Sequence, residues 1–232
     1  MMDSDSVLRH FVNAIAKGDS AAALRMLATS SAELARASFQ AGATRQAAHE
    51  YFLDSIRRYV VAGDTALHIA AAAYQAEIAR ALIRAGADVH ARNRFGDEPL
   101  HAAAVGGPGS PRWDPPAQAA TIMCLVESGA DPNTADKRSV TPLHRAVRTR
   151  CAEAVKTLLK LGADPLRKNK SGSTPMLLAT QNTGRGGTGS PEAKSQQQEI
   201  LQLLEQRARA SELTQPVSQC ENLGVDEGKE VP

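Results

Sequence analysis

The sequence contains few aromatic residues, few cysteines and no excess of either charge. Aromatic residues make up 3% of its 232 positions, which is little for the core of a large sandwich or barrel enzyme. The 27 basic and 25 acidic residues nearly cancel, so neither a polybasic nucleic-acid-binding tail nor an acidic disordered chain is expected. The three cysteines are too scattered for a disulfide framework or a metal-binding pair (Cys124, Cys151 and Cys220).

Long apolar runs are also missing. The longest, Ile69 to Tyr74, has six residues, whereas a membrane-spanning helix needs about 20. The first residues include Asp3 and Asp5 and form no basic-then-apolar pattern, so no secretory signal is expected. With 42% apolar residues the chain can still bury a core. These observations predict a cytoplasmic protein that enters no membrane and carries no metal or other cofactor.

What the sequence does contain is an internal repeat. Four segments share one pattern: GDTALHIAA at 63–71, GDEPLHAAA at 96–104, SVTPLHRAV at 139–147 and GSTPMLLA at 172–179. Aligned on their third residue, they lie 33, 43 and 33 residues apart. A second signature, Gly-Ala-Asp, occurs at 86–88, 129–131 and 162–164, with spacings of 43 and 33. Because the two patterns recur with the same spacings, they predict a 33-residue structural unit that carries one ten-residue insertion.

Each unit has the residue types of two short helices. A threonine before proline is a helix N-cap with proline in the first turn, as at Thr141 and Pro142. Leu143, Ala146 and Val147 then share one face of the first helix. A second helix follows, as at 78–83 and 155–159, and the glycine of Gly-Ala-Asp ends it. The unit is therefore predicted to be a helix-turn-helix.

A 33-residue unit with a Thr-Pro-Leu-His motif resembles the ankyrin repeat family. The resemblance implies an all-α solenoid of about five helix-turn-helix repeats with β-turn fingers. It also implies that the motif histidines His68, His101 and His144 bond to the backbone of neighbouring turns rather than to a metal. The fourth unit departs from the motif, because Leu177 stands at the histidine position.

The domain organisation follows from this alignment. Residues 1–62 are predicted to form a divergent capping repeat with an inserted helix at 49–60, and residues 63–209 the ankyrin repeats. Insertions at 106–117 and 183–197 separate the two helices of their repeats, and the last second helix is expected at 199–204. Residues 210–232, which have few large apolar groups, are predicted to be a disordered tail.

In this family, partners dock on the finger tips and on the exposed side of the first helices. Carried onto this chain, the finger tips are residues 92–97, 136–139 and 167–171. The candidate partner-binding residues there and beside them are Arg92, Arg94, Phe95, Asp97, Lys137, Arg138, Arg148, Arg150, Lys168 and Lys170. Trp113, in the first insertion, is a further candidate anchor, although it is also suited to covering an apolar flank of its own chain.

Charge is uneven along the chain. Residues 88–175 hold 13 basic and 9 acidic residues, whereas residues 190–232 hold 4 basic and 8 acidic residues. We therefore expect a monomeric adaptor or regulator that binds an acidic protein partner, unless the acidic tail itself folds onto the basic fingers. Nucleic-acid binding is the alternative, disfavoured because no aromatic stacking platform accompanies the arginines.

No catalytic motif is complete. The glycine-rich stretch at 184–190 lacks the lysine of a phosphate-binding loop. Cys151 begins a second helix beside Arg148 and Arg150, where a lowered thiol pKa is expected, but no base accompanies it. The chain is therefore predicted not to be an enzyme. Arginine outnumbers lysine 19 to 8, which predicts a bacterial origin.

Overall fold

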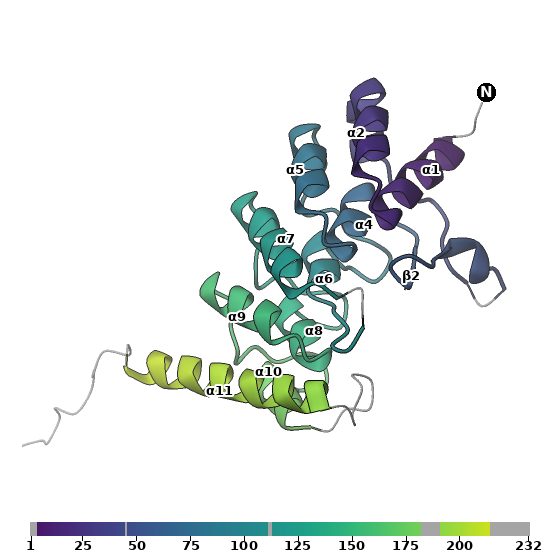
Figure 1. Cartoon of the computed structure of the whole chain (residues 1–232). Coiled ribbons are helices and arrows are strands. Elements are labelled where there is room, and N and C mark those ends of the chain that lie inside the picture. Colours follow the sequence, from purple (N-terminus) through teal and green to yellow (C-terminus); the bar gives the residue numbers. More distant parts are fainter. Residues whose placement is uncertain (1–3, 45, 111–112, 182–190, 214–232) are drawn as a thin grey trace, which may run out of the picture.

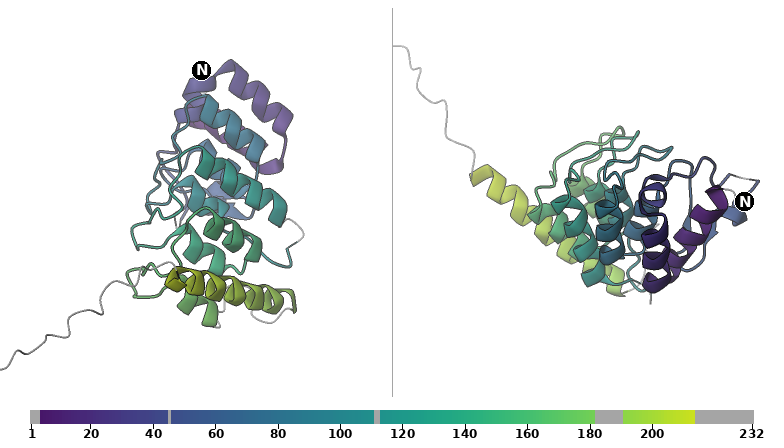
Figure 2. Two further views of the ribbon diagram at one scale, coloured as in Figure 1. Left: turned by 90° about the vertical axis from the view of Figure 1, so that its left-hand side faces the viewer. Right: turned by 90° about the horizontal axis from the view of Figure 1, so that it is seen from above.

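The computed structural model describes residues 4–44, 46–110, 113–181 and 191–213, and these form a curved stack of paired helices (Figure 1). The pairs are α1 (Ser4–Lys17) with α2 (Ser20–Thr29), α4 (Ala66–Ala72) with α5 (Ala76–Arg84), α6 (Pro99–Ala103) with α7 (Pro115–Glu127), α8 (Pro142–Arg148) with α9 (Ala152–Lys160), and α10 (Pro175–Thr180) with α11 (Pro191–Leu213). First helices pack on first helices and second helices on second helices, while the loops between pairs project from one side (Figure 2). The all-α solenoid of about five repeats is confirmed.

The first helices begin where the motif predicts. The Thr141 hydroxyl accepts a hydrogen bond from the amide of His144, and the Thr174 hydroxyl accepts one from the amide of Leu177. Proline occupies the first turn of α6, α8 and α10, where its missing N–H costs no helical bond. Local sequence thus determines where the first helices that carry the motif begin.

Small side chains bring the first helices close together. Ala70 in α4, Ala103 in α6 and Ala146 in α8 are fully buried, as are the leucines of the same helices, Leu100 and Leu143 among them. Alanine at these positions leaves room for a neighbouring helix without a large side chain between the two backbones. The core is consequently a continuous strip along the stack rather than one central cluster.

The loops between pairs are β-turns, as predicted. Asn93, Asp136 and Asn169 each accept, at the main-chain carbonyl, a hydrogen bond from the amide three residues later. Their side-chain oxygens accept further amide hydrogen bonds within the same turns. Gly96 and Ser139 occupy the left-handed region at the turn ends, with φ of 81° and 58°. The finger tips are therefore locally closed structures.

The inserted helix predicted at 49–60 is wrong. Residues His49–Tyr51 form one 3-10 turn, and β1 (Phe52–Leu53) pairs antiparallel with β2 (Arg58–Tyr59). Aromatic and β-branched residues favour such a hairpin, and the Phe52 and Tyr59 rings contact with centroids 4.7 Å apart. The extra helix instead lies earlier, as α3 (Ser31–Arg36). The hairpin is an enlarged first finger.

Three further boundaries differ from the sequence-based prediction. Helix α7 begins at Pro115, inside the insertion placed at 106–117, and α11 begins at Pro191, inside the insertion placed at 183–197. Helix α11 also runs through Leu213, beyond the predicted start of the tail at 210 and the predicted helix end at 204. The other residues of the predicted tail, 214–232, and residues 182–190 lie outside the described residues. No helix in the described ranges is both long and apolar enough to cross a membrane.

Leu143→Ala is expected to lower the free energy of unfolding by about 2–5 kcal/mol, because it leaves a cavity at a fully buried position. Chemical denaturation measures the change. Leu166→Ala is the matched control, since that leucine is 59% exposed and its loss should cost less than about 0.5 kcal/mol. A loss below about 1 kcal/mol for Leu143→Ala would contradict the core assignment.

Candidate functional site

The motif histidines tie the last four repeats to one another. Nε2 of His68, His101 and His144 lies 2.9, 3.0 and 3.0 Å from the main-chain oxygens of Asp97, Val140 and Ser173, respectively. In each ring Nδ1 accepts the backbone N–H of the residue just before the helix, so we assign the proton to Nε2, which donates to the next repeat. The predicted structural role of the histidines is confirmed.

Burial keeps these rings neutral. Desolvation is the largest influence on each, and it lowers the pKa of His68, His101 and His144 below the usual value. Nearby Asp64, Asp97 and Asp136 act in the opposite direction but do not overcome it. No group of three or more His, Cys, Asp or Glu side chains among the described residues is placed to hold a metal ion.

A second set of bonds joins the fingers directly. The amides of Arg94, Lys137 and Lys170 donate to the main-chain oxygens of Ala62, Phe95 and Arg138, at 2.8, 3.0 and 2.9 Å. Each finger is thereby hydrogen-bonded to the one before it. The tips form a fixed row, so a binding surface made from them is already ordered in the free protein.

The acidic groups of the finger tips point inward. Nη2 of Arg145 lies 2.5 Å from Asp97 Oδ1 and 3.2 Å from Asp136 Oδ2, and both carboxylates are more than nine-tenths buried. Beside them, Nη2 of Arg92 lies 2.7 Å from Oε1 of the buried Glu98. These ion pairs hold the acidic groups inside the stack, against arginine side chains.

The basic groups of the same segments are exposed, although Arg92 also bonds to the buried Glu98. Every lysine and arginine of the finger tips is exposed: Arg92, Arg94, Lys137, Arg138, Arg167, Lys168 and Lys170. Phe95 is 48% exposed, with the Arg94 guanidinium 4.8 Å from its ring centroid, and Lys137 Nζ donates to the Arg94 main-chain oxygen at 2.8 Å. The row therefore presents positive charge around one apolar side chain.

Two of the predicted partner-binding residues are buried instead of exposed on the surface. Asp97 is buried against Arg145, and Arg150 is only 3% exposed, in a turn where its φ is 59°. In the described part of the chain, neither terminal nitrogen of Arg150 has a hydrogen-bond partner. Arg148, by contrast, is exposed as predicted. The sequence showed that Arg150 followed a helix but not that the turn folds it inward.

Cys151 also differs from its prediction. It is fully buried, and that burial raises the pKa of its thiol to about 11 instead of lowering it. An un-ionised, inaccessible thiol is a poor nucleophile, so the geometry gives Cys151 no catalytic role.

Arg145 is the functional residue that sequence reasoning missed. It occupies the position after the motif histidine, where the other three units have Ile69, Ala102 and Leu178. A charged residue at a position that is otherwise apolar signals a buried ion pair. That signal was present in the alignment of the repeats.

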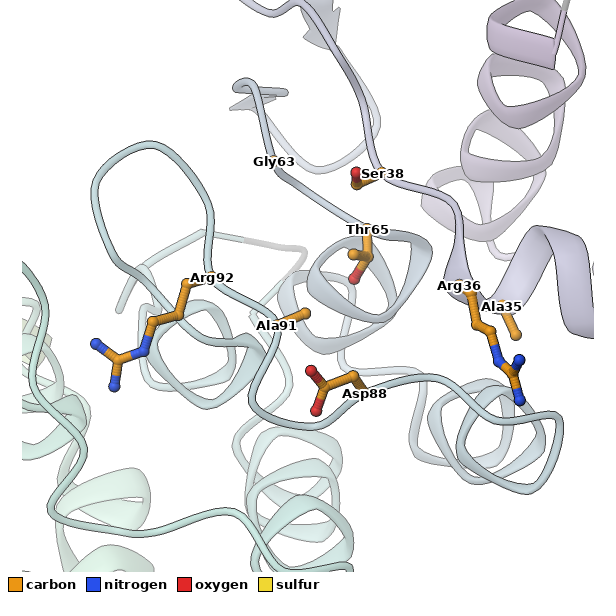
Figure 3. Close-up of a pocket in the computed structure, with 8 residues that line it drawn as sticks. All are labelled: Ala35, Arg36, Ser38, Gly63, Thr65, Asp88, Ala91 and Arg92. Carbon is orange, nitrogen blue, oxygen red and sulfur yellow. The ribbon is translucent and has the colours of Figure 1, made fainter.

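A pocket of about 220 Å³ lies between α3 and the loop that leads to the finger tip at residues 92–97 (Figure 3). Its lining includes Arg36, Asp88 and Arg92, whose charged ends point in different directions in Figure 3. No set of acid, base or nucleophile converges there, so the pocket does not have the arrangement of a catalytic site.

Arg145→Ala should lower the free energy of unfolding by about 3–5 kcal/mol, because it leaves two buried carboxylates without their cation. Arg138→Ala, at an exposed finger tip, is the control and should change it by no more than about 0.5 kcal/mol. Equal, small effects in a denaturant titration would refute the inward-facing ion pair.

Stability should fall as the pH drops below about 6.5, the ordinary histidine pKa. The folded rings have lowered pKa values, so the unfolded chain takes up protons first and each ring contributes up to about 1.4 kcal/mol per pH unit. His101→Gln should make the wild-type slope shallower in unfolding measurements between neutral and mildly acidic pH. A slope that His101→Gln leaves unchanged would argue against a neutral, buried imidazole.

Comparison with known proteins agrees with this geometry. A family described as "Ankyrin repeats (many copies)" matches residues 125–179, and one described as "Ankyrin repeat" matches residues 62–94. Ankyrin repeat and SOCS box protein 16 of Mus musculus is 40% identical over 119 residues, which are 50% of this chain and 25% of that protein. The chain thus spans a quarter of that relative's length.

Two further relatives show how widely the unit is used. Cyclin-dependent kinase 4 inhibitor B of Rattus norvegicus is 39% identical over 101 residues, which are 43% of this chain and 69% of that protein. The 2-5A-dependent ribonuclease of Mus musculus is 44% identical over 59 residues, which are 25% of this chain and 8% of that protein. The shared part is a fold for protein–protein interaction, generally without catalytic activity of its own. With its tandem motif, its histidine-linked stack and these matches, the chain belongs to the ankyrin repeat family.

Proposed function

We propose that the chain is a cytoplasmic adaptor or regulator that binds an acidic surface of a protein partner along its finger tips and the adjoining first helices. One observation carries the proposal: every exposed charge of the finger tips is basic, whereas their two acidic side chains, Asp97 and Asp136, are buried in ion pairs. The surface is thus more basic than the composition of the same segments indicates.

The row has the properties of a preorganised binding surface. Because hydrogen bonds already join the fingers, the fingers lose less conformational entropy on binding a partner than free loops would lose. Arginines such as Arg138 offer planar, two-pronged hydrogen bonding to carboxylates. Phe95 supplies an apolar contact of the kind that anchors interfaces, and Arg148 adds an exposed cation at the end of α8.

The relatives support a regulatory role. Cyclin-dependent kinase 4 inhibitor B is named as an inhibitor of a kinase, and this chain covers 69% of it. We extend regulation by binding, but not the same target, to this chain.

Nucleic-acid binding is the second candidate, because phosphates would also neutralise the exposed basic row. Phe95 is the one aromatic residue in the three finger tips, so no platform for stacking successive bases is present there. Binding to arbitrary DNA or RNA that weakens steeply with salt would favour this candidate over a protein partner.

Affinity capture from the host lysate with mass spectrometry tests the proposal. The test variant, Phe95→Ala/Arg138→Glu/Lys168→Glu/Lys170→Glu, alters exposed finger side chains that make no ion pair with any other residue that the structure describes. The wild type should retain a specific protein with an acidic surface, and the variant should lose it by at least about tenfold.

The matched control is Arg25→Glu/Arg80→Glu/Lys160→Glu, which reverses the same number of exposed charges on the second helices α2, α5 and α9. It should retain the partner as the wild type does. If the finger variant retains the partner, the finger tips are not the binding surface. If the control loses it equally, net charge rather than the finger row explains the capture.

A further inference from the structure

A second hollow lies away from the finger tips. A pocket of about 310 Å³ opens where α7 and α9 begin, against the side of α11. Its lining comes from the first insertion, both helix starts and two positions of α11: Trp113, Pro115, Pro116, Glu153, Gln196 and Glu199. The ten-residue insertion supplies Trp113, so this pocket belongs to this chain and not to the 33-residue repeat itself.

The tryptophan is held in a fixed position. Its indole N–H donates to Gln118 Oε1 at 2.9 Å, and the fully buried Gln118 in turn donates from Nε2 to the Ala103 main-chain oxygen at 2.8 Å. A side chain at Gly106 would come within 2.7 Å of the indole nitrogen, so glycine there makes room for the ring. Because its N–H is already bonded to Gln118, Trp113 lines the pocket with aromatic carbon.

The charged groups of the pocket are all acidic. Glu153 Oε2 lies 3.3 Å from Lys156 Nζ, a partly exposed pair that another cation can replace at little cost. In the described chain the Glu199 side chain makes no ion pair or hydrogen bond, and no basic residue lines the pocket. Gln196 is engaged through Oε1, which accepts the Ala152 amide at 2.9 Å. The pocket therefore combines an aromatic wall with two carboxylates that lack a strong partner.

We propose that this pocket binds an arginine side chain of a protein partner. A guanidinium stacks on an indole ring, and its five donors reach carboxylates on more than one side. The proline and tryptophan walls suit the flat, weakly hydrated guanidinium better than a strongly hydrated ammonium or metal ion. The proposal rests on the proposed function only in assuming a protein partner, and it does not depend on the basic finger row.

Trp113 is the single tryptophan of the chain, so its fluorescence reports on this pocket directly. The full-length protein is titrated with N-acetyl-arginine amide at constant ionic strength, and in parallel with N-acetyl-citrulline amide, which replaces the guanidinium with a neutral urea of similar shape. The arginine compound should change the emission in a saturable way, and the citrulline compound should not.

The Glu153→Gln/Glu199→Gln variant should bind the arginine compound about tenfold more weakly, because it removes two partly exposed charge contacts. Glu192→Gln/Glu205→Gln is the matched control, since both residues are exposed on α11 and neither lines the pocket. Equal responses to arginine and citrulline, equal binding by the two variants, or no saturable response would overturn the proposal.

The finger variant separates this test from that of the proposed function. It should give the wild-type fluorescence response, because none of its substitutions lines the pocket. An arginine response without a captured protein would leave the pocket standing and the finger row in doubt. Capture of a protein by the finger row without an arginine response would support the finger row and overturn the pocket proposal.

Discussion

Buried imidazoles hold the last four repeats of this stack together, and the arrangement of their fingers depends on these side chains. In His68, for example, one nitrogen accepts the amide that starts its own helix and the other donates to Asp97 O of the following finger. Both ring nitrogens are satisfied without charge, so the ring is buried at little cost. Because the acceptor lies just before the next motif, the bond fixes the offset between repeats and places the finger tips in a row.

The two ends of the stack show what replaces this bond. At the first finger, the extended segment after α3 takes over, with the Phe39 amide donating to Asp64 O. At the last repeat, Leu177 takes the histidine position and is 45% exposed, while α11 buries Ile200 and Leu204 at the end of the stack. Between these ends, ion pairs bury the acidic side chains of the fingers, whereas the basic side chains remain exposed to solvent. One packing pattern therefore sets both the stability and the charge of the surface.

The features that sequence predicted correctly are local or periodic. The 33-residue spacing, the threonine caps and the turn residues each act within a few positions of themselves, so they determined the helices and β-turns. The errors concern contacts that the repeated pattern does not encode. The hairpin pairs Phe52 with Tyr59 in the segment before the first motif, and the burial of Cys151 and Arg150 depends on how the turn between α8 and α9 packs. Burial of Asp97 required Arg145, which lies 48 residues away.

Amide hydrogen exchange in the free protein tests most directly whether the fingers form an ordered row. The amides of Lys137 and Lys170 donate to the preceding finger, whereas the amide of Lys168 donates to no group in the described chain. The account predicts strong protection at Lys137 and Lys170, approaching that of α8, with fast exchange at Lys168. Exchange of all three at the rate of an unstructured peptide would contradict a preordered finger surface.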